Sequence, residues 1–211
     1  MDAFTYIKET EPAARQLFES RAYYRKILEE MPKPVFVSST SFENKAAWDR
    51  EFSEWYEANK AEVEESRAKS REYFGLYFSN ATLCGSIIQI ASMAVELFSQ
   101  NHQVPESCQR LVKPGQKAAK YCIGREVHGL PVGIVIYAAR NQYNHWDDAR
   151  PHKITKAIFE ALALGHGHGP ERDPAFDLAN PSLEIYSHNV LGLLEWSSYD
   201  AYEQDIRALI T

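Results

Sequence analysis

The stretch LPVGIVIYAARNQYNHWDD, residues 130–148, joins an apolar run to a polar cluster without a break. Its first ten residues are almost all apolar, and the next nine include one arginine, one histidine, two asparagines and two aspartates. Polar groups carried to the edge of a core are costly unless they are paired or used. We therefore take Arg140, Asn141 and His145 as the candidate functional residues.

The secondary structure of this stretch has two readings. Val132, Ile134, Val135 and Ile136 would suit a buried strand, because β-branched residues are enriched there. A helix over residues 130–149 is favoured, because the segment is too long for one strand and stays compatible with a helix after the apolar run. Pro131 also suits the first turn of a helix.

Working outward, the rest of the chain is dominated by helical periodicity. Pro12 and Pro181 suit helix starts, and Ser41 is a plausible N-cap. The run PVFV, residues 34–37, could be a short strand or an extended connector. The other helices are expected at residues 12–31, 41–73, 81–100, 116–124 and 153–164, from residue 181 onward, and from residues 197–198 to 210.

These segments predict an all-α helical bundle of six to eight helices. We expect residues 1–75 to form an N-terminal helical extension and residues 76–211 to form the bundle, or the whole chain to be one continuous domain.

Composition limits the kinds of partner. The net charge of −6 and the lack of a long Lys/Arg run disfavour a broad nonspecific grip on nucleic acid, while leaving room for a small basic site. Three cysteines without CxxC spacing indicate reduced thiols. The N-terminus shows no signal peptide, and the apolar residues 81–98 are interrupted by polar side chains, which is typical of a buried helix. We expect a soluble, cytoplasmic protein without membrane contact.

Arginine and histidine at this spacing can serve phosphate chemistry. The guanidinium fork suits phosphate, and imidazole accepts a proton near neutral pH. On a helix, Arg140 and His145 would be separated by about 140° around the axis and about 7.5 Å along it. They would therefore act together only if both reach one cleft.

The motif Arg140-Asn141-x-x-x-His145, late in an all-helical chain, resembles the HEPN superfamily (higher eukaryote and prokaryote nucleotide-binding domains). The resemblance covers roughly residues 80–210. It implies a helical bundle that forms a homodimer and brings two motifs into one cleft. Many members are metal-independent endoribonucleases of toxin–antitoxin or phage-defence systems, so RNA or a nucleotide, and an antitoxin protein, are the implied partners. No cofactor is implied.

The resemblance assigns a role to each motif residue. His145 would be the general base or acid, Arg140 would stabilise the phosphate charge, and Asn141 would hold either the arginine or the phosphate. The alternative is a non-catalytic HEPN-fold module that binds a nucleotide or regulates a partner. Asp147 and Asp148 favour that alternative, because carboxylates repel an anionic substrate. A third interpretation is an unrelated bundle with a fortuitous match.

Two histidine groups were weighed as metal sites. His166 and His168, in the loop GHGHG, lack a third ligand at nearby spacing, so a flexible linker is favoured. His145, Asp148 and His152 would share one face of a continuous helix, but Pro151 is expected to break it. We therefore expect no metal site.

Overall fold

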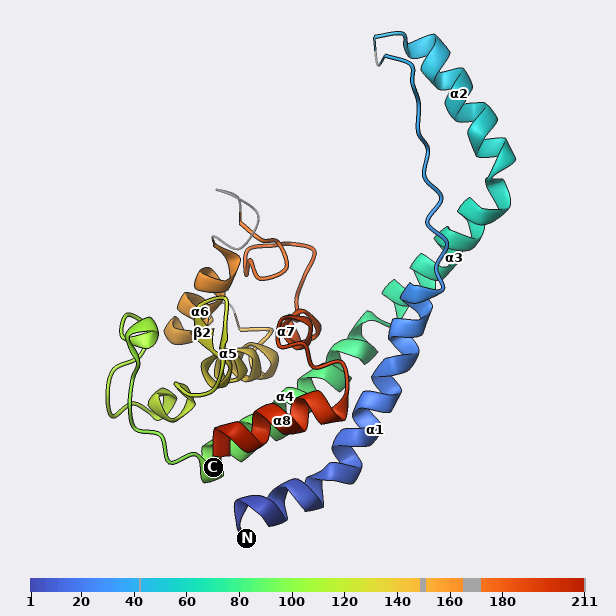
Figure 1. The fold of residues 1–211 in the computed structure, drawn as a ribbon. Helices are drawn as coiled ribbons and strands as arrows, with labels where there is room; N and C mark the ends of the chain where they lie inside the picture. Colours follow the sequence, from blue (N-terminus) through green and yellow to red (C-terminus); the bar gives the residue numbers. More distant parts are fainter. Residues whose placement is uncertain (42, 149–150, 165–171, 211) are drawn as a thin grey trace. The chain divides into compact units, whose positions relative to one another are not determined.

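The protein is all-α, with 65% of the residues that the structure describes in helices and 2% in strands. The structure is a computed structural model that describes residues 1–41, 43–148, 151–164 and 172–210. The α-helices are α1 (Ala3–Glu29), α2 (Lys45–Ala58), α3 (Lys60–Gly75), α4 (Tyr77–Phe98), α5 (Val132–Asn144), α6 (Lys153–Ala163), α7 (Ser187–Leu193) and α8 (Tyr199–Ile210) (Figure 1). Two short 3₁₀ helices, η1 (Glu106–Cys108) and η2 (Lys117–Tyr121), and an antiparallel pair of two-residue strands, β1 (Glu126–Val127) and β2 (Leu130–Pro131), complete the elements.

The chain divides into two compact units. Unit 1 comprises Met1–Arg21 and Ser79–Thr211, and unit 2 comprises Ala22–Phe78. The first helix therefore contributes to both units. The boundaries expected from the sequence were an extension at residues 1–75 and a bundle at residues 76–211, or one continuous domain.

Helix α5 is central to unit 1, where it packs against α6, α7 and η2. Its Val/Ile cluster is completely buried, as is the inner face of α4 around Ile87 and Ile88. A side chain at Gly133 would collide with the backbone carbonyl of Tyr121, so glycine allows the first turn of α5 to lie directly against η2. The apolar run of residues 130–139 thus forms the middle of the core.

The expected helix over this run is confirmed, with different ends. Leu130 and Pro131 belong to the strand pair, and α5 ends at Asn144 rather than near residue 149. Helices α6 and α8 have nearly the expected bounds. Helix α1 begins at Ala3 instead of near Pro12, because the Asp2 carboxylate accepts a hydrogen bond from the Thr5 N–H (2.8 Å) and caps its first turn.

Three other helix predictions were wrong in their bounds or continuity. The helix expected over residues 41–73 is two helices, separated at Asn59, whose side-chain amide donates to the Trp55 carbonyl (2.7 Å). Asn44, not Ser41, caps α2. The helix expected from Pro181 begins only at Ser187.

The segment before α7 is held in turns by its own side chains. Asp173, Asp177 and Asn180 each accept a hydrogen bond from the backbone N–H two residues later, at 2.8–3.1 Å. Such bonds compete with helix formation. The helix expected over residues 116–124 is the shorter 3₁₀ helix η2, where the Asn101 amide donates to the carbonyl of Ala119 (2.8 Å).

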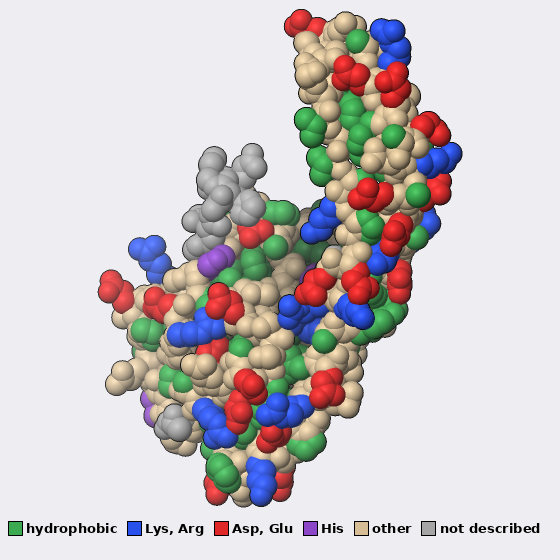
Figure 2. Space-filling model, turned by 45° about the vertical axis from the view of Figure 1, so that its right-hand side comes forward, with side chains coloured by type: hydrophobic (Ala, Val, Ile, Leu, Met, Phe, Trp, Pro, Cys, Tyr) green, Lys and Arg blue, Asp and Glu red, His purple; other side chains and the backbone are tan. Residues whose placement is uncertain are grey.

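Unit 2 has a small aromatic cluster. Phe36 contacts Trp48, Phe52 and Trp55, with ring centroids 5.3–5.5 Å apart. Residues 34–37 form an extended connector without helix or strand assignment. On the face shown in Figure 2, acidic and basic side chains are interspersed.

Helix α4 is long and apolar enough to cross a membrane, judged by length and composition alone. Half of its most apolar window is buried inside the protein, and the core helix of a soluble protein meets the same criterion.

Candidate functional site

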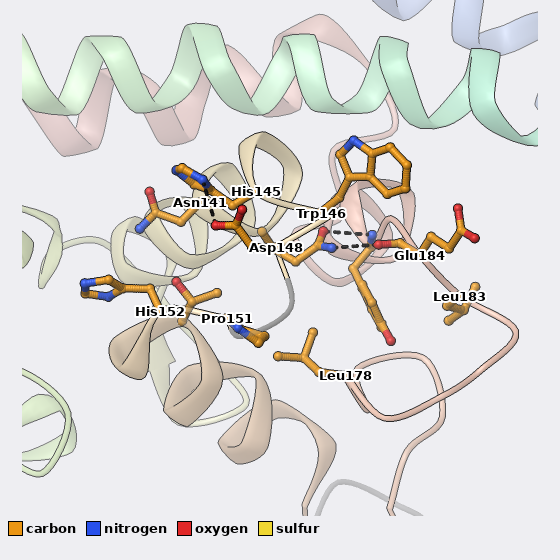
Figure 3. Close-up of a pocket in the computed structure, with 12 residues that line it drawn as sticks. Asn141, His145, Trp146, Asp148, Pro151, His152, Leu178, Leu183 and Glu184 are labelled. Atoms are coloured by element: carbon orange, nitrogen blue, oxygen red, sulfur yellow. Dashed lines mark hydrogen bonds and ion pairs between the residues drawn. The ribbon is translucent and has the colours of Figure 1, made fainter.

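A cleft of about 500 Å³ lies where the end of α5 meets the start of α6 and the segment 178–186 (Figure 3). Two of the three predicted site residues, Asn141 and His145, line it. The other lining residues are Gln142, Trp146, Asp148, Pro151, His152, Thr155, Leu178, Leu183, Glu184 and Tyr186.

His145 is the C-cap residue of α5, and its backbone N–H donates to the Asn141 carbonyl (3.1 Å). Its Nδ1 lies 3.1 Å from the Asp148 carboxylate, and both side chains are more than half exposed (Figure 3). A carboxylate on Nδ1 favours the tautomer whose proton is on that nitrogen, which leaves Nε2 as a proton acceptor. Asp148 therefore holds one ring nitrogen of His145 and leaves the other facing outward to accept a hydrogen bond.

Arg140 is not among the residues that line the cleft. Its Nη1 donates to Asn141 Oδ1 at 3.1 Å, while its Nε is buried and has no hydrogen-bond partner among the described residues. The pKa of Glu96 is lowered, mainly by the hydrogen bond from Lys117 and also by the nearby positive charge of Arg140. The guanidinium thus holds the Asn141 side chain by its oxygen.

Gln142 fixes the opposite wall of the cleft. Its Nε2 donates to the Glu184 carbonyl (2.8 Å), and its Oε1 accepts from the Tyr186 N–H (3.1 Å) (Figure 3). The side chain is only 8% exposed. One residue of α5 therefore holds a segment more than forty residues further along the chain.

His152 and Thr155 bring the start of α6 into the same cleft. The expected helix break near Pro151 is confirmed, since α5 ends at Asn144 and α6 begins at Lys153. Both His145 and His152 nevertheless line the cleft. Trp146, at the rim, is 47% exposed. Sequence reasoning did not identify Thr155, Gln142 or Trp146 as site residues, and none of them belongs to a recognisable motif.

Metal binding has no support from the described residues, in which no group of three or more His, Cys, Asp or Glu side chains could hold an ion. His166 and His168 lie outside the described residues.

Comparison of the chain with protein-family models, with curated proteins and with solved structures finds no match.

Proposed function

We propose that the chain is a metal-independent endoribonuclease with the cleft at the end of α5 as its active site. The observation that carries the proposal is the His145–Asp148 pair, which stands in an open cleft beside Asn141. RNA cleavage without a metal uses a general base and a general acid, and a positioned imidazole can serve as either near neutral pH. The resemblance of the Arg-Asn-x3-His motif to HEPN nucleases adds to this geometry.

In the proposed reaction, His145 Nε2 takes the proton of a ribose 2′-hydroxyl. The 2′-oxygen then forms a bond to phosphorus while the bond from phosphorus to the 5′-oxygen breaks. His152 lines the same cleft and would return a proton to the leaving 5′-oxygen. The products are a 2′,3′-cyclic phosphate and a 5′-hydroxyl.

Asn141 and Arg140 would act together on the phosphate. The Asn141 side-chain oxygen is already engaged by Arg140, so its amide N–H groups remain to donate to a phosphate oxygen. Arg140 would fix this orientation and add a positive charge behind it. Our proposal extends to a cytoplasmic homodimer in a toxin–antitoxin or phage-defence setting, with an antitoxin protein as a partner.

One observation favours the non-catalytic module as a second candidate. The described cleft lining contains Asp148 and Glu184 but no Lys or Arg, and Arg140 is not among the lining residues. A site of this kind would bind a nucleotide or partner peptide without cleaving it.

Induced expression of the protein in bacteria, with cellular RNA analysed on gels, separates the two functions. Wild type should arrest growth and fragment RNA, and His145→Ala and Arg140→Ala should do neither. His102→Ala, an exposed histidine that does not line this cleft, is the matched control and should behave as wild type. Soluble wild-type protein with intact RNA would refute the nuclease and favour the binding module.

A further inference from the structure

The first turn of α6 forms part of the cleft wall and has no side-chain cap. His152 is the N-cap residue, and its side chain makes no capping hydrogen bond. The first hydrogen bond of the helix runs from the Lys156 N–H to the His152 carbonyl (2.9 Å). The N–H groups of residues 153–155 donate to no described residue. Free N–H groups at the positive end of a helix dipole attract an anion.

Thr155, in this same turn, supplies an independent sign of a ligand. It lines the cleft, it is only 1% exposed, and its hydroxyl has no hydrogen-bond partner among the described residues. Leaving a buried hydroxyl without a hydrogen-bond partner destabilises the folded state.

Packing does not account for this hydroxyl. Thr155 occupies the cleft end of the buried stripe of α6, which continues through Ile158, Phe159 and Leu162. A valine of nearly the same shape would fill this position without an unpaired polar atom. The hydroxyl oxygen is enclosed and lacks a partner, and a ligand that displaces its cover at the cleft would supply one.

We propose that the N-terminal turn of α6 and the Thr155 hydroxyl bind a phosphodiester group of single-stranded RNA. Each extra negative charge on the ligand would be repelled by the carboxylate of Asp148, which lines the cleft. A phosphodiester carries one negative charge, whereas a phosphate monoester carries nearly two at neutral pH. The half-exposed indole of Trp146 at the rim provides a surface on which an unpaired base can stack.

This site rests on the proposed function for the identity of its ligand, but binding does not require cleavage. The probe is therefore a fluorescein-labelled single-stranded 2′-O-methyl RNA, which lacks the attacking hydroxyl, and its affinity is measured by fluorescence anisotropy. Thr155→Val should weaken binding about tenfold, because a hydrogen bond to a charged group is lost. Thr155→Ser should retain wild-type affinity. The matched control is Thr10→Val. The Thr10 hydroxyl donates only to carbonyls within α1, so its removal should not change the affinity for the RNA probe.

Urea unfolding of the same variants separates binding from folding. Thr155→Val should be as stable as wild type or more stable, because it removes an unpaired buried hydroxyl. Unchanged affinity of Thr155→Val, or a loss of affinity that only accompanies a loss of stability, would overturn the proposal.

Competition identifies the source of the phosphate. A dinucleoside monophosphate should displace the probe at lower concentration than AMP or inorganic phosphate does. The reverse order would overturn the phosphodiester assignment. If the probe binds with the expected Thr155 dependence but the protein cuts no ordinary RNA, the α6 site is supported and only the proposed nuclease fails.

Discussion

Replacement of Gln142 by methionine tests how the cleft wall is held. Methionine has nearly the same length and volume as glutamine. It cannot donate to the Glu184 carbonyl or accept from the Tyr186 N–H, so both hydrogen bonds are lost. Each lost bond is worth about 1 kcal/mol, and the stranded backbone groups raise the cost, so we expect unfolding to become easier by about 2–3 kcal/mol. With a urea m-value of about 2 kcal/mol/M, the midpoint should fall by about 1 M or slightly more.

The matched control is Gln89→Met, which removes a longer bond from the Asn144 amide (3.3 Å) at a more accessible position. It should shift the free energy of unfolding by less than about 0.5 kcal/mol. Both variants are followed by tryptophan fluorescence in urea. If Gln142→Met is no less stable than Gln89→Met, Gln142 does not hold the cleft wall.

Three further predictions concern pH, thiols and a buried carboxylate. Burial lowers the pKa of His188 from 6.5 to about 4. As the pH falls below about 6.5, the unfolded chain therefore binds this proton while the folded chain does not. The free energy of unfolding should decrease accordingly, by about 2 kcal/mol at pH 5. His188→Gln should remove that part of the slope and the exposed control His102→Gln should not; equal slopes in both would contradict the assignment. The three cysteines are all buried, so they should react with a thiol reagent only after the protein unfolds. Rapid reaction of the folded protein would contradict this prediction. Asp205→Asn should lower the free energy of unfolding by about 2 kcal/mol, because the Asp205 carboxylate accepts hydrogen bonds from the Trp196 indole (2.8 Å) and from Arg125 (3.0 Å). An unchanged urea midpoint would contradict this prediction.

The helical class and the main core segment could be predicted from local pattern. The run of residues 130–139 was recognised as helical because of its length, and α5 confirms this. Helix ends were harder to predict, because side chains compete with the backbone there. The start of α7 was wrong because Asp173, Asp177 and Asn180 stabilise turns, an effect that apolar periodicity does not capture.

The candidate site was predictable only in part. The helical spacing of Arg140 and His145 already implied different directions, and the structure places only His145 and Asn141 on the cleft. The roles of Gln142 and Thr155 depend on how α5, α6 and the segment 178–186 meet. Such contacts join residues far apart in the chain, so a local motif could not identify them.

The most direct test of the central claim is cleavage of single-stranded RNA by the purified protein in the presence of EDTA. We predict that wild type produces fragments ending in a 2′,3′-cyclic phosphate, identified by mass spectrometry. A His145→Ala variant that is as stable as wild type should produce none. Asp148→Asn should retain cleavage at a reduced rate, because it keeps the fold but loses the carboxylate on Nδ1. Cleavage that persists in His145→Ala, or that disappears when EDTA is added, would contradict the account.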